Sequence, residues 1–588
     1  MPLSRERVMP AGVPLDGIAG RVGPARGGER AAAGSARRVR ALWVLVLGVS
    51  LVGLVALYDR SFISIDGAFY VSAAQNLASG HGFATSIIWN EEQYRAGGMP
   101  APQTVFPPGY PLLIAVVSRL GVDPPYAAFL VALLAFGAIP LVIYDILRAA
   151  GHPPLRAFAV SAVWLGAPFA WFNVLSCMSE MLFTLLTLLS LRCVMQSDRD
   201  PGRRDLWLAA AGTVAGLAFT VRYQGVYYLI SLGLFFLLRV TRARDRQSVR
   251  ALMLVAGPAS VFVVALFVRN HLLIGKLVTL IPEDRSLLDV LRTFAWGLGE
   301  LLGFTRSGLL GGGVPEVMFV IVVVAGLVGG VCWAGRFALD RTALGAALGN
   351  PHISLSLAYV TTSIILMVQG AQNYATGHIS PRYLLALIPF GLLCLPDGLP
   401  LVRLTPSRAW HARAVRLWWG VAALALVAGQ VNVFHHHWRQ LHQANPYRTM
   451  ADALQRPVAN ESLLQFLRDR VTTASPLLGN EAQLLGAVLD RPVLGLPRAG
   501  YTRKVWTDDQ VRGLVAAYGV DYVVFFPGLF NPSDPQDRNR PFFRELTRGS
   551  VPPWLVAILL ARDVRLYRVD RAAIAGSSSD LGHARRGG

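Results

Sequence analysis

The stretch ALWVLVLGVSLVGLVALYDRSFISIDGAFYVSAAQNLASGHGF, residues 41–83, decides the fold. Residues 41–58 form an apolar run long enough to cross a hydrocarbon core of roughly 30 Å. Because no A-x-A-like cleavage site follows, this run is expected to be a retained membrane span rather than a signal peptide. Within the segment that follows, residues 62–83, the one acidic residue is Asp66.

The composition of the whole chain indicates a polytopic α-helical membrane protein. Its 588 residues are 53% hydrophobic and only 15% charged, and its mean hydropathy is +0.45. The formal charge of +20 is explained by cytoplasmic loops that face anionic lipid, so we expect no nucleic-acid partner. The four cysteines lie in or beside apolar runs without CxxC spacing, which supports neither a zinc site nor a disulfide framework.

Apolar runs divide the chain into about eleven expected spans. They begin near Ala41, Tyr126, Arg156, Ser179, Leu206, Val226, Ala251, Glu316, Ser354, Tyr383 and Val415. Arginines gather in alternate loops, which by the positive-inside rule places the N-terminus in the cytoplasm. We therefore expect a multi-pass protein of the inner (plasma) membrane, with the first long loop, residues 59–125, on the outer face.

The expected domains follow from this map. Residues 1–40 predict a disordered basic cytoplasmic tail, 41–435 a transmembrane domain, 436–570 an outer-face α/β domain, and 571–588 a disordered tail. In the third of these, strands are predicted at residues 476–480, 492–496, 521–526 and 564–569, and helices at 461–470, 481–489 and 507–519. Their alternation predicts a small, mostly parallel sheet. No GxGxxG, Walker or GxSxG pattern occurs there, so a binding or packing role is expected.

Asp66 has two open interpretations. Residues 67–79 carry apolar residues at helical spacing, and Gly80 stands where a helix C-terminal cap belongs. A short helix is therefore predicted with Asp66 at its N-cap, where the carboxylate would accept backbone N–H bonds. The alternative is a chemical role as a base. The sequence alone leaves both open.

Two Arg-Tyr pairs lie at the expected outer ends of spans, Arg222-Tyr223 and Arg382-Tyr383. Such residues commonly snorkel and anchor the membrane interface. Positive-inside bias disfavours arginine on the outer side, however, so the two pairs indicate an anionic partner. The planar guanidinium suits phosphate oxygens, and a lipid phosphate is the natural candidate.

Three further segments complete the expected outer face. Ser179 is placed to cap a helix in which Glu180 favours the dipole, a structural role that competes with a functional one. His378 is four residues from Arg382 and either joins a phosphate or acceptor site or is simply solvated. Residues 106–121 (FPPGYPLLIAVVSRLG) are too short and interrupted to span and predict a helix lying in the interface.

Taken in order, these segments resemble the GT-C membrane glycosyltransferases, nearest the group of protein mannosyltransferases and lipid A aminoarabinose transferases. The motifs are the Asp beyond the first span with AFYVSAAQNLASGHGF, then FPPGYPLLIA, SEMLFTLLTLLSL, AFTVRYQG and PRYLLALIP. The likeness runs from about residue 40 to residue 435. It implies a glycosyltransferase that moves a sugar from a polyprenyl-phosphate carrier to a glycan, lipid or protein acceptor.

The resemblance also implies roles for single residues. Asp66 matches the catalytic carboxylate, and Arg222 and Arg382 stand where arginines would meet the carrier phosphate; Glu180, Tyr223, His378 and Tyr383 are secondary candidates. Many relatives carry an acid beside the catalytic Asp, whereas this chain has Gly67. That departure speaks against a metal-assisted version, so no cofactor is expected to be required and no metal ligands are assigned.

The chemistry fits this assignment independently. A glycosidase needs two carboxylates because its leaving alcohol must be protonated, whereas a phosphate leaves as an anion, so one base and two cations suffice. The expected outcome is inversion by single displacement. Two rivals stay open: a transporter or flippase for an anionic or lipid-linked solute, although no internal duplication is evident, and a non-catalytic assembly factor for envelope polysaccharide.

Overall fold

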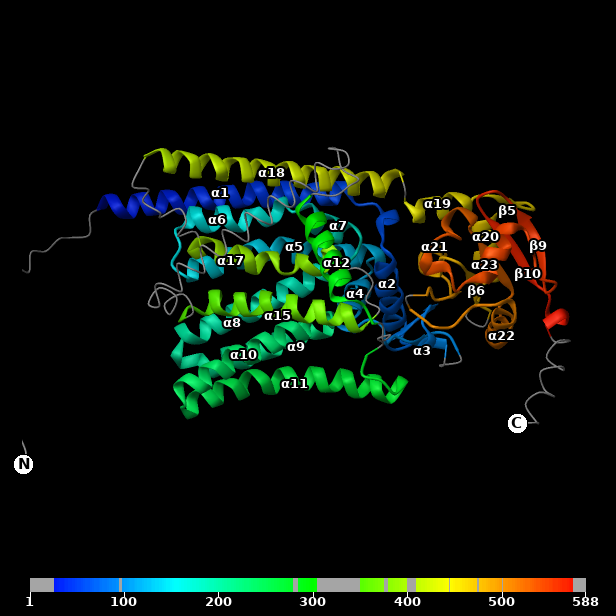
Figure 1. Ribbon diagram of the computed structural model, residues 1–588, viewed down its shortest axis with the longest axis horizontal. Helices are drawn as coiled ribbons and strands as arrows, with labels where there is room; N and C mark the ends of the chain where they lie inside the picture. The colour runs from blue at the N-terminus through cyan, green and yellow to red at the C-terminus, as the bar shows by residue number, and fades with distance from the viewer. Residues whose placement is uncertain are drawn as a thin grey trace, which may run out of the picture.

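The computed structural model describes residues 26–94, 98–278, 284–303, 349–374, 379–398, 409–443, 445–472, 475–499 and 501–574. The long helices lie side by side in a bundle, and an α/β layer stands beyond one end of it (Figure 1). Between these two parts α2 runs across the ends of the long helices.

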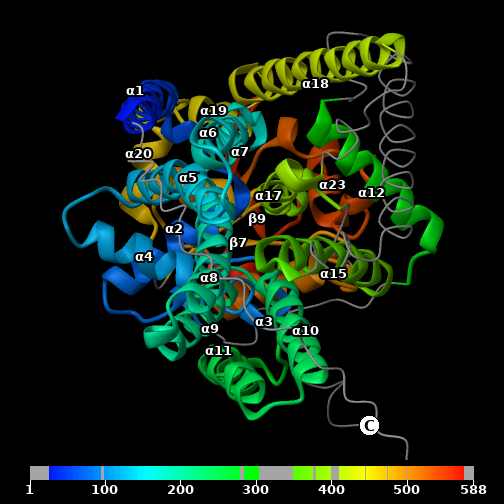
Figure 2. The ribbon, with the colours of Figure 1, turned by 90° about the vertical axis from the view of Figure 1, so that its left-hand side faces the viewer.

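Within the described ranges six helices are long and apolar enough to cross a membrane. They are the Arg37–Leu57 part of α1 (Arg26–Leu57), α5 (Pro124–Ala149), α8 (Glu180–Arg199), α10 (Gly225–Ala243), α11 (Arg246–Ile274) and α15 (Pro351–Asn373). Seen end on, α8 lies near the middle of the bundle, while α1 and α11 lie at its edge (Figure 2). The chain is therefore a multi-span helical protein, as its composition predicts.

The other apolar runs are not among these six helices, so the count of eleven is not confirmed. The run near Arg156 breaks before Pro168 into α6 (Pro154–Ala162), η2 (Val163–Gly166) and α7 (Pro168–Leu175), bent by 53°. The run near Tyr383 divides into α16 (Pro381–Leu385) and α17 (Ile388–Gly398). Those near Leu206 and Val415 form α9 (Arg204–Val221) and α18 (Ala409–Gln443), and the run near Glu316 lies outside the described residues.

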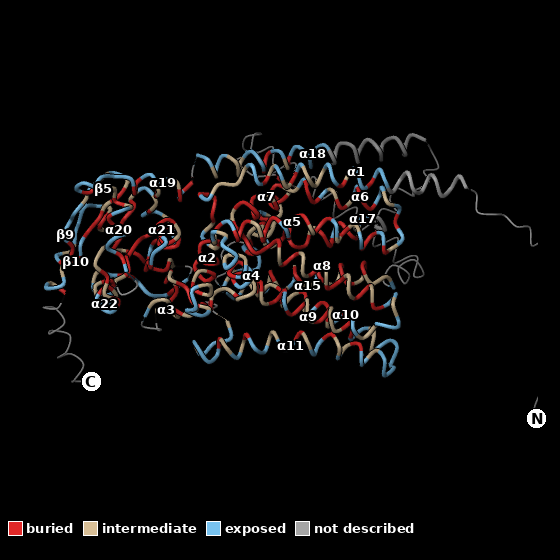
Figure 3. The backbone as a smooth tube through the Cα atoms, turned by 180° about the vertical axis from the view of Figure 1, so that it is seen from behind, coloured by how far each residue is buried: buried red, intermediate tan, exposed pale blue. Residues whose placement is uncertain are grey.

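Apolar side chains on the outside of the bundle fit contact with lipid. Val44 and Val52 of α1 are 76% and 69% exposed, and Val261 of α11 is 65% exposed. Buried residues are concentrated inside the bundle and inside the α/β layer (Figure 3). Such apolar exposure is unusual in a water-facing monomer and is expected of helices that face hydrocarbon.

Short elements fill the junction between the bundle and the α/β layer. They are η1 (Arg60–Phe62), α2 (Ile65–Ala78), α3 (Glu91–Tyr94), α4 (Gly109–Ser118), α12 (Leu287–Leu302) and the paired strands β1 (Ala84–Thr85) and β3 (Ala101–Pro102). As predicted, the FPPGYPLL segment is too short to span, and it forms the ten-residue α4. A Cβ on Gly109 would lie 2.7 Å from the carbonyl oxygen of Thr220, so glycine lets α4 start against the end of α9.

The α/β layer contains the four strands that its sequence predicts, in a six-stranded sheet of order β2-β7-β6-β8-β10-β9. Its strands are β2 (Ile87–Ile88), β6 (Leu477–Gly479), β7 (Val493–Gly495), β8 (Tyr522–Phe525), β9 (Leu555–Leu560) and β10 (Arg565–Val569). The first four in spatial order are parallel, and β10 pairs antiparallel with β8 and β9. The mostly parallel sheet is thus present, with β2 and β9 as strands that the sequence did not reveal.

Helices cover this sheet and connect its strands. They are α19 (Pro446–Ala453), α20 (Leu463–Arg470), α21 (Ala482–Leu489), α22 (Asp508–Tyr518) and α23 (Pro541–Arg548), with the two-stranded pair β4 (Pro457–Val458) and β5 (Glu461–Ser462) and the turns η5 (Pro527–Leu529) and η6 (Pro535–Asp537) beside them. The predicted helical segments correspond to α20, α21 and α22.

The strand β2 ties the first long loop to the α/β layer. Ile87 and Ile88 pair in parallel with Val493 and Leu494 of β7. A second contact reinforces this pairing, because the Tyr518 hydroxyl donates a hydrogen bond to the Tyr94 carbonyl at 2.9 Å. The segment that follows α2 is therefore an edge strand of a sheet built from residues about 400 positions later.

Candidate functional site

Ser64, not Asp66, caps α2. The Ser64 Oγ accepts a hydrogen bond from the Gly67 N–H at 2.9 Å, and α2 begins at Ile65. The predicted N-cap role of Asp66 is therefore wrong: the helix starts earlier than the apolar spacing suggests, and serine is as good a cap as aspartate. At the other end Gly80 adopts the left-handed conformation with φ of 84°, as predicted for a helix end. The Asp66 carboxylate is thereby left for another partner.

That partner is Arg382, the second residue of α16. Its Nη1 donates to the Asp66 Oδ2 at 2.5 Å, while its Nη2 donates to the Tyr383 hydroxyl at 3.2 Å. The Asp66 side chain is 19% exposed and that of Arg382 is 31% exposed. Both the carboxylate and the guanidinium are thus only partly exposed to solvent. Charge-assisted hydrogen bonds are stronger in such surroundings than at a fully exposed surface.

Gly67 leaves no room for a second acid beside Asp66. A Cβ at this position would lie 2.7 Å from the Ser176 carbonyl oxygen and 3.1 Å from the Ser64 Oγ. The Ser64 Oγ also donates to the Ser176 oxygen at 3.1 Å, so the turn before α8 holds the start of α2. Packing therefore excludes a side chain at position 67, so no second acid can stand directly after Asp66.

The second arginine, Arg222, follows the last turn of α9 and is buried. Its Nη1 lies 2.9 Å from the Glu180 Oε1 and donates to the Ser179 Oγ at 3.0 Å. The Ser179 Oγ in turn donates to the Tyr70 hydroxyl at 3.0 Å. Ser179 does occupy the N-cap position of α8, but its side chain makes no capping bond. Its hydroxyl links α2 to Arg222 instead.

Glu180 is a buried ion-pair partner rather than a helix-dipole residue at a surface. Its side chain is 1% exposed and that of Arg222 is 10% exposed. Isolated buried charges are costly, so each of these groups requires the other. The Nε of Arg222 is buried and finds no hydrogen-bond partner among the described residues, which leaves it one donor for an acceptor atom.

Tyr383 stands between the two arginines. Its ring centroid is 5.8 Å from the Cζ of Arg222 and 5.0 Å from the Cζ of Arg382. The electron-rich ring face moderates the repulsion between two nearby guanidinium groups. Tyr223 has a different place: its hydroxyl donates to the Thr104 carbonyl at 3.2 Å and accepts from the Asn270 amide at 2.9 Å, so it fixes the first loop to α11.

Asp66, Arg222 and Arg382 line one cavity of about 630 Å³. Tyr70, Tyr223 and Tyr383 also border it. The rest of its wall is largely apolar and comes from α9, α10, α11 and α15, and includes Phe219, Val226, Ile230, Phe267, Leu366 and Met367. Charged groups therefore sit at one part of a cavity whose remaining wall suits hydrocarbon.

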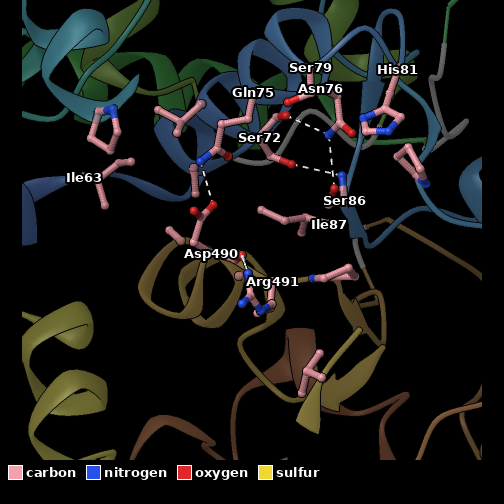
Figure 4. Close-up of a pocket in the computed structure, with 18 of the residues that line it drawn as sticks. Ile63, Ser72, Gln75, Asn76, Ser79, His81, Ser86, Ile87, Asp490 and Arg491 are labelled. Carbon is pink, nitrogen blue, oxygen red and sulfur yellow. Dashed lines mark hydrogen bonds between the residues drawn. The ribbon is translucent and has the colours of Figure 1, made fainter. Parts of the chain in front are cut away.

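A second cavity of about 260 Å³ lies on the opposite face of α2, between that helix, β2 and the end of α21 (Figure 4). Its polar groups largely bond to one another. The Gln75 amide donates to Asp490 at 2.6 Å, and the Asn76 amide donates to the Ser72 carbonyl at 2.9 Å and the Ser86 hydroxyl at 3.1 Å. We regard this cavity as part of the seam between α2 and the α/β layer.

Of the residues singled out from the sequence, the structure brings together Asp66, Glu180, Arg222, Arg382 and Tyr383, and places Tyr223 on the same cavity. His378 lies outside the described residues. Sequence reasoning missed Tyr70 of α2, whose ring is buried against α4. Its hydroxyl accepts the hydrogen bond from the Ser179 Oγ. Among the described residues, no group of three or more His, Cys, Asp and Glu is placed to hold a metal ion.

Comparisons with known proteins find structures but no sequence relatives. No family model matches the chain, and no curated protein matches it significantly. ArnT from Cupriavidus metallidurans bound to undecaprenyl phosphate is 13% identical, with a TM-score of 0.49 over 94% of this chain and 99% of its own. AglB, an oligosaccharyltransferase from Archaeoglobus fulgidus in complex with an inhibitory peptide and a dolichol-phosphate, is 11% identical, with a TM-score of 0.46 over 83% and 70%.

The arabinofuranosyltransferase AftD from Mycobacteria is 12% identical, with a TM-score of 0.44 over 90% of this chain and 41% of its own. All three likenesses have TM-scores below 0.5 at identities of 11–13%.

Proposed function

We propose that this protein is a membrane glycosyltransferase that moves a sugar from a polyprenyl-phosphate carrier to an acceptor hydroxyl. The observation that carries the proposal is the cavity in which one carboxylate, Asp66, and two guanidinium groups, Arg222 and Arg382, meet an apolar wall. A lipid-linked phosphate needs cations for its headgroup and hydrocarbon contact for its chain. The cavity offers both in one space.

The ion pairs of the site allow an anionic ligand to replace Asp66 as the partner of Arg382. Arg222 is paired with Glu180, and Arg382 with Asp66, so the four groups together are neutral. A phosphate at Arg382 would compete with Asp66 for the same guanidinium. Donor binding would therefore release the carboxylate at the moment when a base is needed.

The reaction follows from these positions. The acceptor hydroxyl gives its proton to Asp66 while its oxygen forms a bond to the anomeric carbon. The bond between that carbon and the phosphate oxygen breaks, and both bonding electrons leave with the phosphate, whose charge the two arginines stabilise. A single displacement of this kind inverts the anomeric configuration.

The arginine distribution supports a topology for this reaction. We place the N-terminus in the cytoplasm of a cell whose inner membrane the chain spans about eleven times. The site and the α/β layer then lie on the outer face. A carrier lipid would enter from the bilayer, and the acceptor would approach from the aqueous side.

The test is donor turnover by the purified protein in lipid nanodiscs, with a radiolabelled polyprenyl-phosphate sugar prepared from host membranes. Asp66→Asn should lose turnover by about 10²- to 10⁴-fold, because a positioned general base contributes that much. Asp123→Asn, an exposed acid 3.8 Å from Arg60, is the matched control and should keep full turnover. Equal turnover in both variants would contradict the proposal.

The transporter alternative makes an opposite prediction, which is tested with the protein reconstituted into sealed lipid vesicles. A flippase would move labelled carrier lipid across the vesicle bilayer and form no new glycosidic product. No transferase activity would then exist for Asp66→Asn to abolish. Analysis of the product by NMR reports the anomeric configuration and so tests inversion separately.

A further inference from the structure

Two aromatic rings from distant parts of the chain meet beside the candidate site. Trp89 follows β2 in the first long loop, and Tyr501 follows β7 in the α/β layer. Their ring centroids are 4.4 Å apart with an interplanar angle of 58°. Tyr501 remains 45% exposed, so the pair presents aromatic surface outward rather than burying it.

The pair lies at the edge of the sheet where ligands commonly bind. Because β2, β7, β6 and β8 are parallel, their carboxyl ends open at the same edge. In open α/β sheets ligands bind beyond the carboxyl ends of the strands. Trp89 comes directly after the last residue of β2 and thus stands at that edge, and its ring contact with Tyr501 places Tyr501 beside it.

The backbone below Trp89 is shaped to receive its ring. A Cβ on Gly495, the last residue of β7, would lie 2.9 Å from the Trp89 Cδ1 and 2.6 Å from the Ala482 Cβ. Glycine therefore lets the indole lie close against the end of the strand. This contact fixes the ring orientation at little cost in side-chain entropy.

The Tyr501 hydroxyl lies within electrostatic range of the candidate site. Partial desolvation raises the pKa of Tyr501, and the charge of Asp66 raises it further, while Arg382 and Arg498 lower it. The phenol is thus within electrostatic reach of Asp66 and Arg382 and stays protonated at neutral pH. Tyr501 belongs to the α/β layer beyond the end of the bundle, whereas the apolar wall of the cavity comes from bundle helices (Figure 1).

A hydrogen-bonding group accompanies the rings. The Tyr501 N–H donates to the Arg498 carbonyl at 2.8 Å. The Arg498 Nη2 lies 2.7 Å from the Glu481 Oε1 and its Nε lies 3.4 Å from the Asp537 Oδ1, and the side chain is 25% exposed. Sugar-binding sites combine a flat aromatic surface, which meets the C–H face of a sugar ring, with planar polar groups that meet its hydroxyls. Trp89, Tyr501 and Arg498 supply both.

We propose that Trp89 and Tyr501 form a stacking platform for a sugar ring of the acceptor, and hence that the acceptor is a carbohydrate. A ring held there presents a hydroxyl toward Asp66 from the side opposite the carrier lipid. This inference rests on the proposed function for the chemistry at Asp66. The binding of a sugar ring to the platform can be measured without that chemistry.

The first experiment is saturation-transfer NMR on the whole protein in lipid nanodiscs, which avoid sugar-based detergents. The probes are the methyl glycosides of glucose, galactose, mannose and arabinose. At least one should bind, and Tyr501→Leu, which keeps apolar packing but removes the ring, should weaken it about tenfold. Tyr501→Phe should bind as the parent does, as should Tyr522→Ala, which removes a ring at the amino end of β8.

The outcomes separate the possible roles of the pair. If no probe binds the parent protein, or if Tyr501→Leu and Trp89→Leu both bind as it does, the pair is only a clasp between the loop and the sheet and the inference is overturned. Thermal unfolding of each variant identifies loss of fold.

Kinetics with the labelled donor distinguish the source of the sugar. With the tightest-binding methyl glycoside as the acceptor, Tyr501→Leu should raise the KM for that glycoside about tenfold and leave the KM for donor unchanged. The converse would assign the platform to the donor sugar and overturn the inference. If Asp66→Asn keeps turnover, the proposed function fails. If Asp66→Asn loses turnover while Tyr501→Leu keeps both glycoside binding and the KM for acceptor, only the platform fails.

Discussion

Arg382 donates a hydrogen bond to Asp66 across 316 positions of sequence, and the two residues belong to α16 and α2. Because Ser64 performs the capping, the carboxylate serves the ion pair alone. The geometry thus separates two roles that the sequence could not distinguish at Asp66, and each can be tested by itself.

The cap and the acid should respond differently to substitution. Ser64→Ala should destabilise the protein by about 1 kcal/mol, the usual cost of losing an N-cap. Asp66→Asn should change the unfolding temperature little, since it keeps the shape of the side chain and α2 keeps its cap. Thermal unfolding monitored by intrinsic fluorescence checks both, and a larger loss in Asp66→Asn than in Ser64→Ala would show that the carboxylate is structural.

Arg382→Lys tests two-point recognition of the donor phosphate. Lysine keeps the positive charge but loses the planar fork, so the KM for donor should rise about tenfold while the folded protein persists. Arg119→Lys, on the first loop, replaces an arginine that bonds the Leu77 carbonyl at 3.3 Å and is the control. An unchanged KM for donor in Arg382→Lys would remove this arginine from the phosphate site.

The buried pair of Arg222 and Glu180 should be costly to break from one side. Arg222→Leu leaves Glu180 buried without its counter-charge, and we expect a loss of about 3–5 kcal/mol in stability. Adding Glu180→Gln to that variant should restore part of the loss. Arg239→Leu breaks the partly exposed pair with Asp198 and should cost less than about 1 kcal/mol. Equal losses in the two single variants would contradict a buried pair.

Gly67→Ala should destabilise the protein although alanine is the better helix former. The new methyl group would press on the Ser176 carbonyl oxygen at 2.7 Å, which outweighs the gain of about 1 kcal/mol in helix propensity. Gly513, inside α22, has nothing within 4 Å of a built Cβ, so Gly513→Ala should stabilise. The opposite signs of the two shifts in unfolding temperature are the measurement, and stabilisation by both would refute the close approach.

The α/β layer should lose stability as the pH rises through the pKa of Glu481. Burial raises the pKa of this carboxyl, and Arg498 opposes the rise only in part. The folded protein therefore holds this proton more tightly than the unfolded chain, whose glutamate pKa is about 4.3. The stabilisation is fully present below that value and is lost above the folded pKa.

Hydrogen exchange of amides in β6 and α21, measured from pH 4 to pH 7 and corrected for intrinsic rates, reports this loss. Glu481→Gln cannot ionise, so its protection should depend less on pH than that of the parent protein. The same pH dependence in both proteins would exclude Glu481 as the source.

Local signals in the sequence explain what could be predicted of the fold. The strands β6, β7, β8 and β10 are short apolar runs bounded by turn residues, and each was expected where it lies. The strand β2 has only Ile87 and Ile88 and becomes a strand because β7 pairs with it, so no local pattern marks it. The number of spans stays a prediction, because hydropathy does not show where a run bends, as the run near Arg156 does by 53° before Pro168.

The sequence points to the candidate arginines by the side of the membrane on which they are expected, not by the residues that they contact. Arg222 and Arg382 stood out as arginines where arginine is disfavoured, and the structure places both on one cavity. The pairing of Arg222 with Glu180 and the link through Tyr70 depend on how α2, α8 and α9 pack. Periodicity within one helix carries no information about a neighbour that is distant in sequence.

The edge strand β2 has a consequence for protein engineering. The loop that carries Asp66 and the sheet that it completes cannot be exchanged as independent modules. The sheet without the loop has β7 as an unpaired edge strand, and the loop without the sheet has Trp89 without its partner Tyr501. Chimeras between homologues should therefore keep residues 59–125 and the α/β layer from the same parent.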